Sequence, residues 1–353
     1  MISLENAEIF LRERFADEIT SIELIGTNIC VNSLLAYPIL TSSFYDKSSS
    51  TKVQNELGTL MGEILFFNHN NEVEIQSLPI NRAICLLQDY PTDVIADDRY
   101  VFTSDYLLIH KSFVEEYIEN YKKNSAIWGW YFHKEDLPNI NFDGYRIVQN
   151  ITATKNIEVN RPLYFETLEV AFKEANPFLR FLKMYHLLEL RFDIHTAEKI
   201  RDYLGQVNKE IEIGRLLRDY NREDILRLES LILMNVDVVK ITPVLDKVIH
   251  YRGNAERIFY DYSKESNPLK SRNDFLAILS AGGFSEPNVK GILNGRAYEV
   301  FIKKLTAHWI YRIRCCIAHS KLGEYLMIKA DEDFITEFGE PFLNEIIIHC
   351  YKK

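Results

Sequence analysis

The hydrophobic pattern of the chain changes its period near residue 160, and this change constrains the fold more than any other feature. Before it, apolar and β-branched residues occur in short runs separated by Asn, Asp, Gly and Ser, which is typical of strands joined by turns. After it, apolar residues recur every three to four positions almost to the end, as amphipathic helices require. The sequence therefore predicts an α+β N-terminal domain followed by an all-α helical C-terminal domain.

The expected boundary lies within residues 156–162, which gives one domain of residues 1–158 and another of residues 159–353. After an opening helix, the first domain should contain strands over 21–32, 62–67, 72–78, 82–88, 99–104 and 145–154 and a helix over 106–123. The runs 62–67 and 72–78 flank Asn-His-Asn-Asn and should pair as a hairpin. The second domain should contain helices over 178–192, 197–204, 211–218, 222–234, 243–252, 255–263, 273–280, 287–294, 297–319 and 331–350.

Composition excludes several classes of protein. With 353 residues, 47% of them hydrophobic, the chain can bury two cores. Its five cysteines show no metal-ligand spacing and should be reduced thiols. The acidic first residues do not resemble a signal peptide, and no apolar run reaches the roughly 18 residues that span a bilayer, so we expect a cytoplasmic protein without a membrane partner. No phosphate-binding loop, dinucleotide fingerprint or zinc-protease motif occurs, and we expect neither a cofactor nor a bound metal.

Charge is distributed unevenly along the chain. The net charge is −10, and residues 1–160 hold 12 Lys/Arg against 23 Asp/Glu, whereas residues 161–353 hold 29 against 28. A protein that coats nucleic acid would normally be basic. However, residues 303–321 contain five basic side chains and no acid, including Lys303, Lys304 and Lys321. These lysines are candidate RNA-binding residues that could hold a few phosphates, and the alternative is a solvated helix face balanced by acids elsewhere.

The same segment reads His-Trp-Ile-Tyr-Arg-Ile-Arg-Cys-Cys-Ile-Ala-His-Ser-Lys from residue 308 to residue 321. Two arginines precede His319, Arg314 with four residues between and Arg312 with six. A helical residue turns by about 100°, so Arg312 lies on nearly the same side as His319 and Arg314 lies about 140° away. Regular helical geometry thus favours Arg312 as the partner of His319, and a bend before the histidine would admit Arg314.

This run resembles the Arg-x4–6-His motif of the HEPN ribonucleases. The earlier run Phe-Leu-Arg-Phe-Leu-Lys-Met-Tyr-His-Leu-Leu-Glu, residues 178–189, looks like the first long helix of their ApeA-like branch. The resemblance covers about residues 161–353 and implies that Arg314 and His319 are catalytic, with His319 as general acid or base and Arg314 on the phosphate. Arg312, Cys315 and Glu189 are possible catalytic or supporting residues. Cys315 departs from the family, which commonly has Asn, Asp or His after the arginine.

The resemblance also implies a function. Such a chain would be a metal-independent endoribonuclease of bacterial antiviral defence, or a toxin, that cleaves tRNA or other RNA, single-stranded RNA among it, and leaves a 2′,3′-cyclic phosphate or its hydrolysed form. It would form a homodimer with its site at the dimer interface, and the acidic first domain would sense or regulate, meeting a phage-derived or protein trigger. The alternative is a noncatalytic helical dimerisation or interaction protein with a degenerate HEPN motif.

Three further groups of residues have a structural and a functional interpretation. His186 and Glu189 resemble half of a carboxylate metal site, but no second Glu-x-x-His follows, so a packing role is expected, with Glu189 alternatively holding Arg314 or Arg312. The run Trp128-Gly-Trp-Tyr-Phe132 is more typical of a core than of a base-stacking platform. Cys315 and Cys316 lie within four residues of His319, and burial is favoured over a nucleophilic role.

Overall fold

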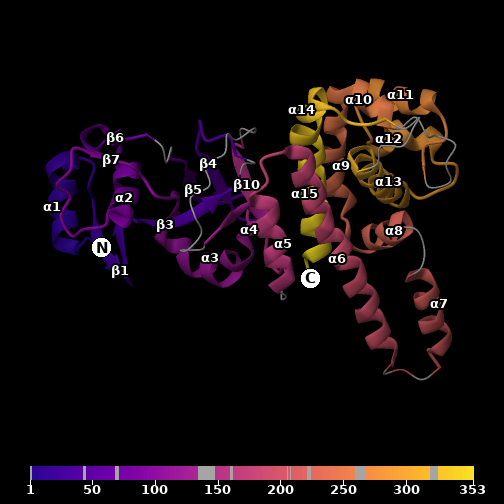
Figure 1. The fold of residues 1–353 in the computed structure, drawn as a ribbon, viewed down its shortest axis with the longest axis horizontal. Helices are drawn as coiled ribbons and strands as arrows, with labels where there is room; N and C mark the ends of the chain where they lie inside the picture. Colours follow the sequence, from indigo (N-terminus) through magenta and orange to yellow (C-terminus); the bar gives the residue numbers. More distant parts are fainter. Residues whose placement is uncertain are drawn as a thin grey trace. The chain divides into compact units, whose positions relative to one another are not determined.

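The computed structural model describes residues 2–42, 45–67, 71–133, 148–159, 162–204, 206, 208–220, 224–258, 267–318 and 325–353. The chain divides into two compact units, Met1–Ile157 and Glu158–Lys353. The first unit is built on a sheet, and the second consists of helices (Figure 1). The predicted order, a sheet-containing region followed by an all-helical one, is confirmed.

An eight-stranded sheet forms the centre of the described part of the first unit. Its strands are β1 Ile22–Ile25, β2 Asn28–Val31, β3 Leu34–Thr41, β4 Thr51–Gln54, β5 Leu60–Leu65, β8 Asp105–His110, β9 Tyr131–Phe132 and β10 Asn150–Thr152. Their order is β1-β2-β3-β8-β5-β4-β10, with β9 paired to the end of β3. Neighbours are antiparallel except β10, which runs parallel to β4. The short strands β6 (Val73–Glu74) and β7 (Arg99–Tyr100) form a separate pair.

The two central strands, β3 and β8, are buried on both faces of the sheet. One face packs against helices α1 (Leu4–Phe15) and α2 (Ile80–Asp89), and Ala36 and Leu108 belong to that core. Successive residues of a strand point to opposite faces, so Leu35 and Ile109, which are also fully buried, face the other way. Helices α3 (Val114–Asn120) and α4 (Ser125–Trp128) belong to this second side, where the ring of Tyr37 meets that of His133.

Several predicted elements of the first unit are wrong, and two of the errors share a physical cause. The expected strand over 82–88 lies in helix α2, and the start of the expected helix over 106–123 is strand β8. Short apolar runs that are buried all round lack the period that separates a strand from a helix. The expected hairpin between 62–67 and 72–78 does not form, because β5 pairs with β4 and β8 whereas β6 pairs with β7. The strand region 21–32 is confirmed as the β1–β2 hairpin.

The aromatic run after α3 is part of the core of the first unit. Trp128, Trp130 and Tyr131 are buried, and the Tyr131 hydroxyl lies 2.9 Å from that of Tyr117. The ring of Trp128 meets that of Tyr131 edge-on at 5.4 Å. The core-packing interpretation of this run is therefore confirmed.

The second unit is a helical bundle around α13. Its helices are α5 Pro162–Phe172, α6 Pro177–Leu204, α7 Glu210–Tyr220, α8 Asp224–Asn235, α9 Val238–Asp246, α10 Arg252–Ile258, α11 Arg272–Ser280, α12 Glu286–Val289, α13 Tyr298–Ala318, α14 Glu332–Phe334 and α15 Glu340–Tyr351. Helices α13 and α15 each pack against α6, α8 and α9. Trp309, near the middle of α13, is fully buried between the rings of Phe275 and Phe338.

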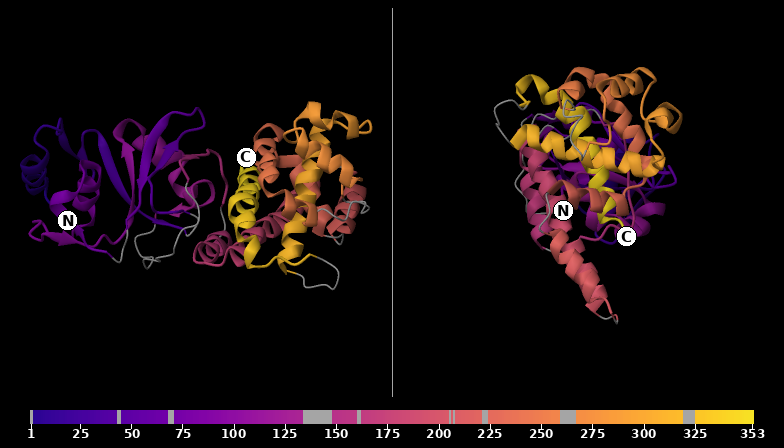
Figure 2. Two further views of the ribbon diagram at one scale, coloured as in Figure 1. Left: turned by 90° about the horizontal axis from the view of Figure 1, so that it is seen from above. Right: turned by 90° about the vertical axis from the view of Figure 1, so that its right-hand side faces the viewer.

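Helix α6 is one continuous helix of 28 residues, not two helices over 178–192 and 197–204. The four residues between these ranges are Asp-Ile-His-Thr, which include no Gly or Pro and therefore do not break the helix. The second half of α6 and α7 form a hairpin that projects from the bundle (Figures 1 and 2). Among the described residues of 193–217 none is buried.

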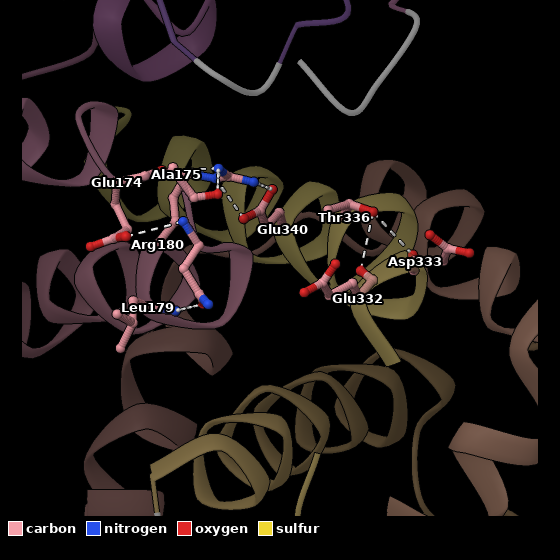
Figure 3. Close-up of polar contacts among 9 residues, drawn as sticks. Glu174, Ala175, Leu179, Arg180, Glu332, Asp333, Thr336 and Glu340 are labelled. Atoms are coloured by element: carbon pink, nitrogen blue, oxygen red, sulfur yellow. Dashed lines mark hydrogen bonds and ion pairs between the residues drawn. The ribbon is translucent and has the colours of Figure 1, made fainter. Parts of the chain in front are cut away.

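A buried ion pair joins the start of α6 to the start of α15 (Figure 3). Arg180 Nε and Nη2 donate to the two carboxylate oxygens of Glu340 at 2.8 and 3.1 Å. Both side chains are almost completely buried, at 0% and 1% exposure. Arg180 Nη1 also donates to the carbonyl oxygen of Glu174 at 3.0 Å. A π-helical turn, Ile335–Gly339, precedes Glu340, so the expected helix over 331–350 is interrupted.

Candidate functional site

The two arginines of the motif lie in different environments on α13. Arg312 is buried, with 4% of the residue exposed, whereas the side chain of Arg314 is 21% exposed. Residues two apart on a helix differ by about 200° in direction, so one arginine faces the interior when the other reaches the surface. His319 follows the last described residue of α13 and, with Lys321, lies outside the described residues.

Arg314 contacts helix α6. Its Nη2 lies 3.8 Å from Oε1 of Glu189, and its guanidinium carbon lies 5.8 Å from the centroid of the Tyr185 ring. The partly exposed guanidinium is therefore held between a carboxylate and an aromatic ring. Glu189 contacts Arg314, one of the two arginines that the sequence suggested for it.

Glu189 also binds a histidine. His186 Nδ1 lies 2.5 Å from Oε2 of Glu189, so one carboxylate joins the imidazole to the guanidinium of Arg314. The side chain of His186 is 60% exposed. The packing role expected for His186 is wrong, because the ring lies on the surface of the bundle and not in its core.

Two tyrosines border this group. Burial, with the Glu189 carboxylate adding to it, raises the pKa of Tyr185, and no described residue forms a hydrogen bond with its buried hydroxyl. Burial, with a smaller contribution from the neighbouring Cys315 thiol, raises the pKa of Tyr311 to about 12. Cys315 is itself buried. Buried side chains of this kind lower the local polarity, which strengthens the electrostatic interactions of the charged groups beside them.

A cavity of about 590 Å³ opens on the same side of α6. It is lined by Leu163, Glu166, Thr167 and Val170 of α5, by Lys183, His186, Glu189, Leu190, Phe192 and Asp193 of α6, and by Asp224 and Arg227 of α8. Lys183 is paired with Glu174, and Arg227 with Asp224, each at 2.5 Å. His186 and Glu189 thus belong both to the arginine site and to the cavity wall.

The polar positions of α6 that line the cavity follow a spacing in the sequence, and the prediction of helices from apolar positions did not use it. Lys183, His186, Glu189 and Asp193 are spaced by three, three and four residues, which places them in one polar row along α6. A polar row beside the buried positions of an amphipathic helix marks a surface. The neighbouring residues Leu187 and Leu188 are buried, as the apolar pattern predicts.

The two described lysines of the basic segment are ion-paired. Lys303 Nζ lies 2.6 Å from Oε1 of Glu299 and donates to the Leu233 carbonyl oxygen, and its side chain is only 11% exposed. Lys304 Nζ lies 2.8 Å from Oε1 of Glu229. Phosphate would have to compete with these carboxylates, so RNA binding by Lys303 and Lys304 stays a prediction.

The described residues were also considered as ligands of a metal and as parts of a membrane-spanning helix, and they form neither. No three or more His, Cys, Asp or Glu side chains there gather as a metal site would require. No helix in this part of the chain is both long and apolar enough to cross a bilayer. Comparisons with protein-family models, with curated proteins and with solved structures find no match.

Proposed function

We propose that this chain is a metal-independent endoribonuclease of the HEPN type, in which Arg314 positions the phosphate and His319 transfers a proton. The observation that carries the proposal is the placement of Arg314. It lies partly exposed near the end of α13, five positions before His319, and is held by Glu189 at the wall of a cavity. Because Arg312 is buried, Arg314 is the motif arginine that a substrate can reach.

The residue types fit the chemistry of RNA cleavage. The 2′-hydroxyl of RNA attacks the adjacent phosphorus, which needs proton transfer near neutral pH and a cation for the charge on the phosphate oxygens. Arginine stays charged and offers forked donors to phosphate. Glu189 keeps the guanidinium in place before the substrate arrives. Freedom from a metal is taken from the resemblance of the motif to that family.

The resemblance extends the proposal to partners. The substrate would be tRNA or another single-stranded RNA, and two chains would form a homodimer with the site at their interface. The first unit would be the sensing or regulatory domain that meets a phage-derived or protein trigger. In this role the protein would be cytoplasmic and would serve antiviral defence or act as a toxin.

A noncatalytic interaction protein is the second candidate, and one observation favours it. Arg314, Lys303 and Lys304 are all ion-paired within the chain, as purely structural side chains would be. Helix α13 buries Phe301, Leu305 and Trp309 within its own bundle, so in either candidate only its exposed positions, such as those beside Arg314, are available to a second chain.

An RNA cleavage assay separates the two candidates. The wild-type protein, Arg314→Ala and His319→Ala are incubated with total tRNA and with a single-stranded RNA, with and without EDTA, and the product ends are identified. We expect cleavage by the wild type to give 2′,3′-cyclic phosphates and to be unaffected by EDTA. Each substitution should lower the rate about 100-fold or more, the usual contribution of a general acid–base group for His319 and of a donor that stabilises transition-state charge for Arg314.

Two controls make the result specific. Arg201→Ala removes an arginine with 77% of its side chain exposed, far along α6, and should cleave like the wild type. Arg312→Ala tests the competing arginine, and its melting temperature shows whether a loss of activity is a loss of fold. Cleavage by His319→Ala at the wild-type rate would refute the catalytic proposal, and inhibition by EDTA would refute its metal-free form.

A further inference from the structure

Cleavage of RNA by its own 2′-hydroxyl requires two proton transfers. One removes the proton of the attacking hydroxyl, and the other supplies a proton to the leaving 5′-oxygen. The proposed function assigns one titrating group, His319. His186 is a second histidine beside the same arginine, since Glu189 contacts both His186 and Arg314.

The contact with Glu189 fixes the proton arrangement of the His186 ring. An ionised carboxylate only accepts hydrogen bonds, so in the neutral ring the proton is on Nδ1, which donates to Oε2 of Glu189. The other nitrogen, Nε2, is then an acceptor. Because 60% of the side chain is exposed and the residue lines the cavity, a molecule bound there can reach the ring.

The charges of the cavity favour one part of an RNA substrate. Three helices supply the charged groups that line the cavity around His186: Glu166 of α5, Lys183, Glu189 and Asp193 of α6, and Asp224 and Arg227 of α8. Arg314 of α13 contacts Glu189. Four of the lining groups are acids, and both Lys183 and Arg227 already contact carboxylates. Such a wall repels phosphate and accepts hydrogen bonds from hydroxyl and amino groups. Phe192 and Leu190 add apolar surface against which a nucleobase can pack.

We propose that His186 is a catalytic base and that the cavity holds the ribonucleoside on the 5′ side of the cleaved bond; this inference rests on the proposed function. His186 Nε2 takes the proton of the 2′-hydroxyl, and the 2′-oxygen forms a bond to phosphorus. The bond from phosphorus to the 5′-oxygen breaks, and that oxygen receives a proton from His319. The products are a 2′,3′-cyclic phosphate and a 5′-hydroxyl. Arg314 contacts the phosphate oxygens outside the acidic cavity.

The test compares two histidines on two substrates. One substrate is an oligonucleotide with a single ribonucleotide among deoxynucleotides. The other is a nucleoside 3′-(4-nitrophenyl phosphate), whose leaving group departs without a proton donor. His186→Ala and His186→Gln should lower kcat about 100-fold or more on both substrates, because both need the base. His319→Ala should lower kcat on the first and recover most of it on the second.

The pH profile and a control variant separate this role from a structural one. A base must be unprotonated, so the wild-type kcat should fall at low pH, and His186→Gln should lose that fall. His250→Ala, which removes another exposed histidine of the second unit, should behave like the wild type. Melting curves verify that each variant is folded.

The outcomes are distinct. Wild-type kcat in both His186 variants, or a change confined to KM, overturns the role of His186 and leaves the proposed ribonuclease intact. If the wild type cleaves neither substrate, the proposed function is wrong. It is also wrong if His319→Ala cleaves both substrates as fast as the wild type, and in either case the role of His186 is overturned with it.

Discussion

Replacing Glu340 by alanine should destabilise the second unit strongly. The change leaves the guanidinium of Arg180 buried at 0% exposure, with its two charge-assisted hydrogen bonds to Glu340 removed. Removing one partner of a buried ion pair costs about 3–5 kcal/mol, because the remaining charge is uncompensated. For a unit of this size, this corresponds to a melting temperature lower by about 6–20 °C.

The double replacement Arg180→Met with Glu340→Leu should cost much less than Glu340→Ala alone. Both charges are removed, and apolar side chains of similar length fill the space. The difference between the single and double variants measures the coupling of the pair. Glu256→Ala is the control, since Glu256 contacts Arg252 and Arg272, whose side chains are 51% and 62% exposed, so its loss leaves two solvated charges and should cost little.

Urea unfolding followed by tryptophan fluorescence provides the measurement. The chain has three tryptophans, of which only Trp309 lies in the second unit. In a background with Trp128→Phe and Trp130→Phe, the signal therefore reports the second unit alone. If Glu340→Ala shifts the unfolding free energy no more than Glu256→Ala does, the pair is not buried as described and the reasoning is refuted.

Two further predictions concern the first unit and the glycines. Burial, with a smaller contribution from Lys122, lowers the pKa of His133 to about 3. Between about pH 6.5 and pH 3 the unfolded chain therefore binds a proton that the folded chain does not. The free energy of unfolding should decrease as the pH is lowered through this window. Chemical denaturation of wild type and His133→Gln across these pH values checks this, and an unchanged slope in the variant would contradict it. Gly62→Ala should lower the melting temperature, because its Cβ would lie 2.1 Å from the Leu108 carbonyl oxygen. In Gly253→Ala the Cβ meets nothing within 4 Å, and this substitution in α10 should stabilise the fold by about 0.5–1 kcal/mol. Equal effects of the two substitutions in calorimetry would rule out this account.

The helical character of the second unit was predictable because its signals are local, but α5 was not among the expected helices, and the expected helix over 243–252 spans the end of α9, a 3₁₀ turn and the start of α10. The ranges expected for α11 and α13 agree with the structure within a few residues, since periodic apolar positions and end signals lie within each helix. The sheet was not predictable in the same way. Strand β8 pairs with β3 and β5 from distant parts of the chain, and its apolar run, buried on both faces, gives no period.

The candidate site was predictable only in its residue types. Helical geometry favours Arg312 and the family resemblance favours Arg314, and the choice between them depends on which side of α13 meets the bundle. The contact between Arg314 and Glu189 joins residues 125 positions apart, and no local pattern encodes the relative placement of α6 and α13. The exposure of His186 was not predicted, although the polar row along α6 contains a signal for it.

The π-helical turn before α15 has a consequence for insertions and deletions in this region. A π-turn accommodates one residue more than the α-helical path would, and each α-helical residue advances the following ones by about 100°. Deleting one residue from Ile335–Gly339 should therefore restore a regular helix and leave Glu340 facing Arg180, whereas deleting one residue inside α15 after Glu340 should rotate Phe342 and Leu343 out of the core. The π-turn is thus the position before α15 where the loss of one residue should be tolerated, because the contacts of the last helix keep their register.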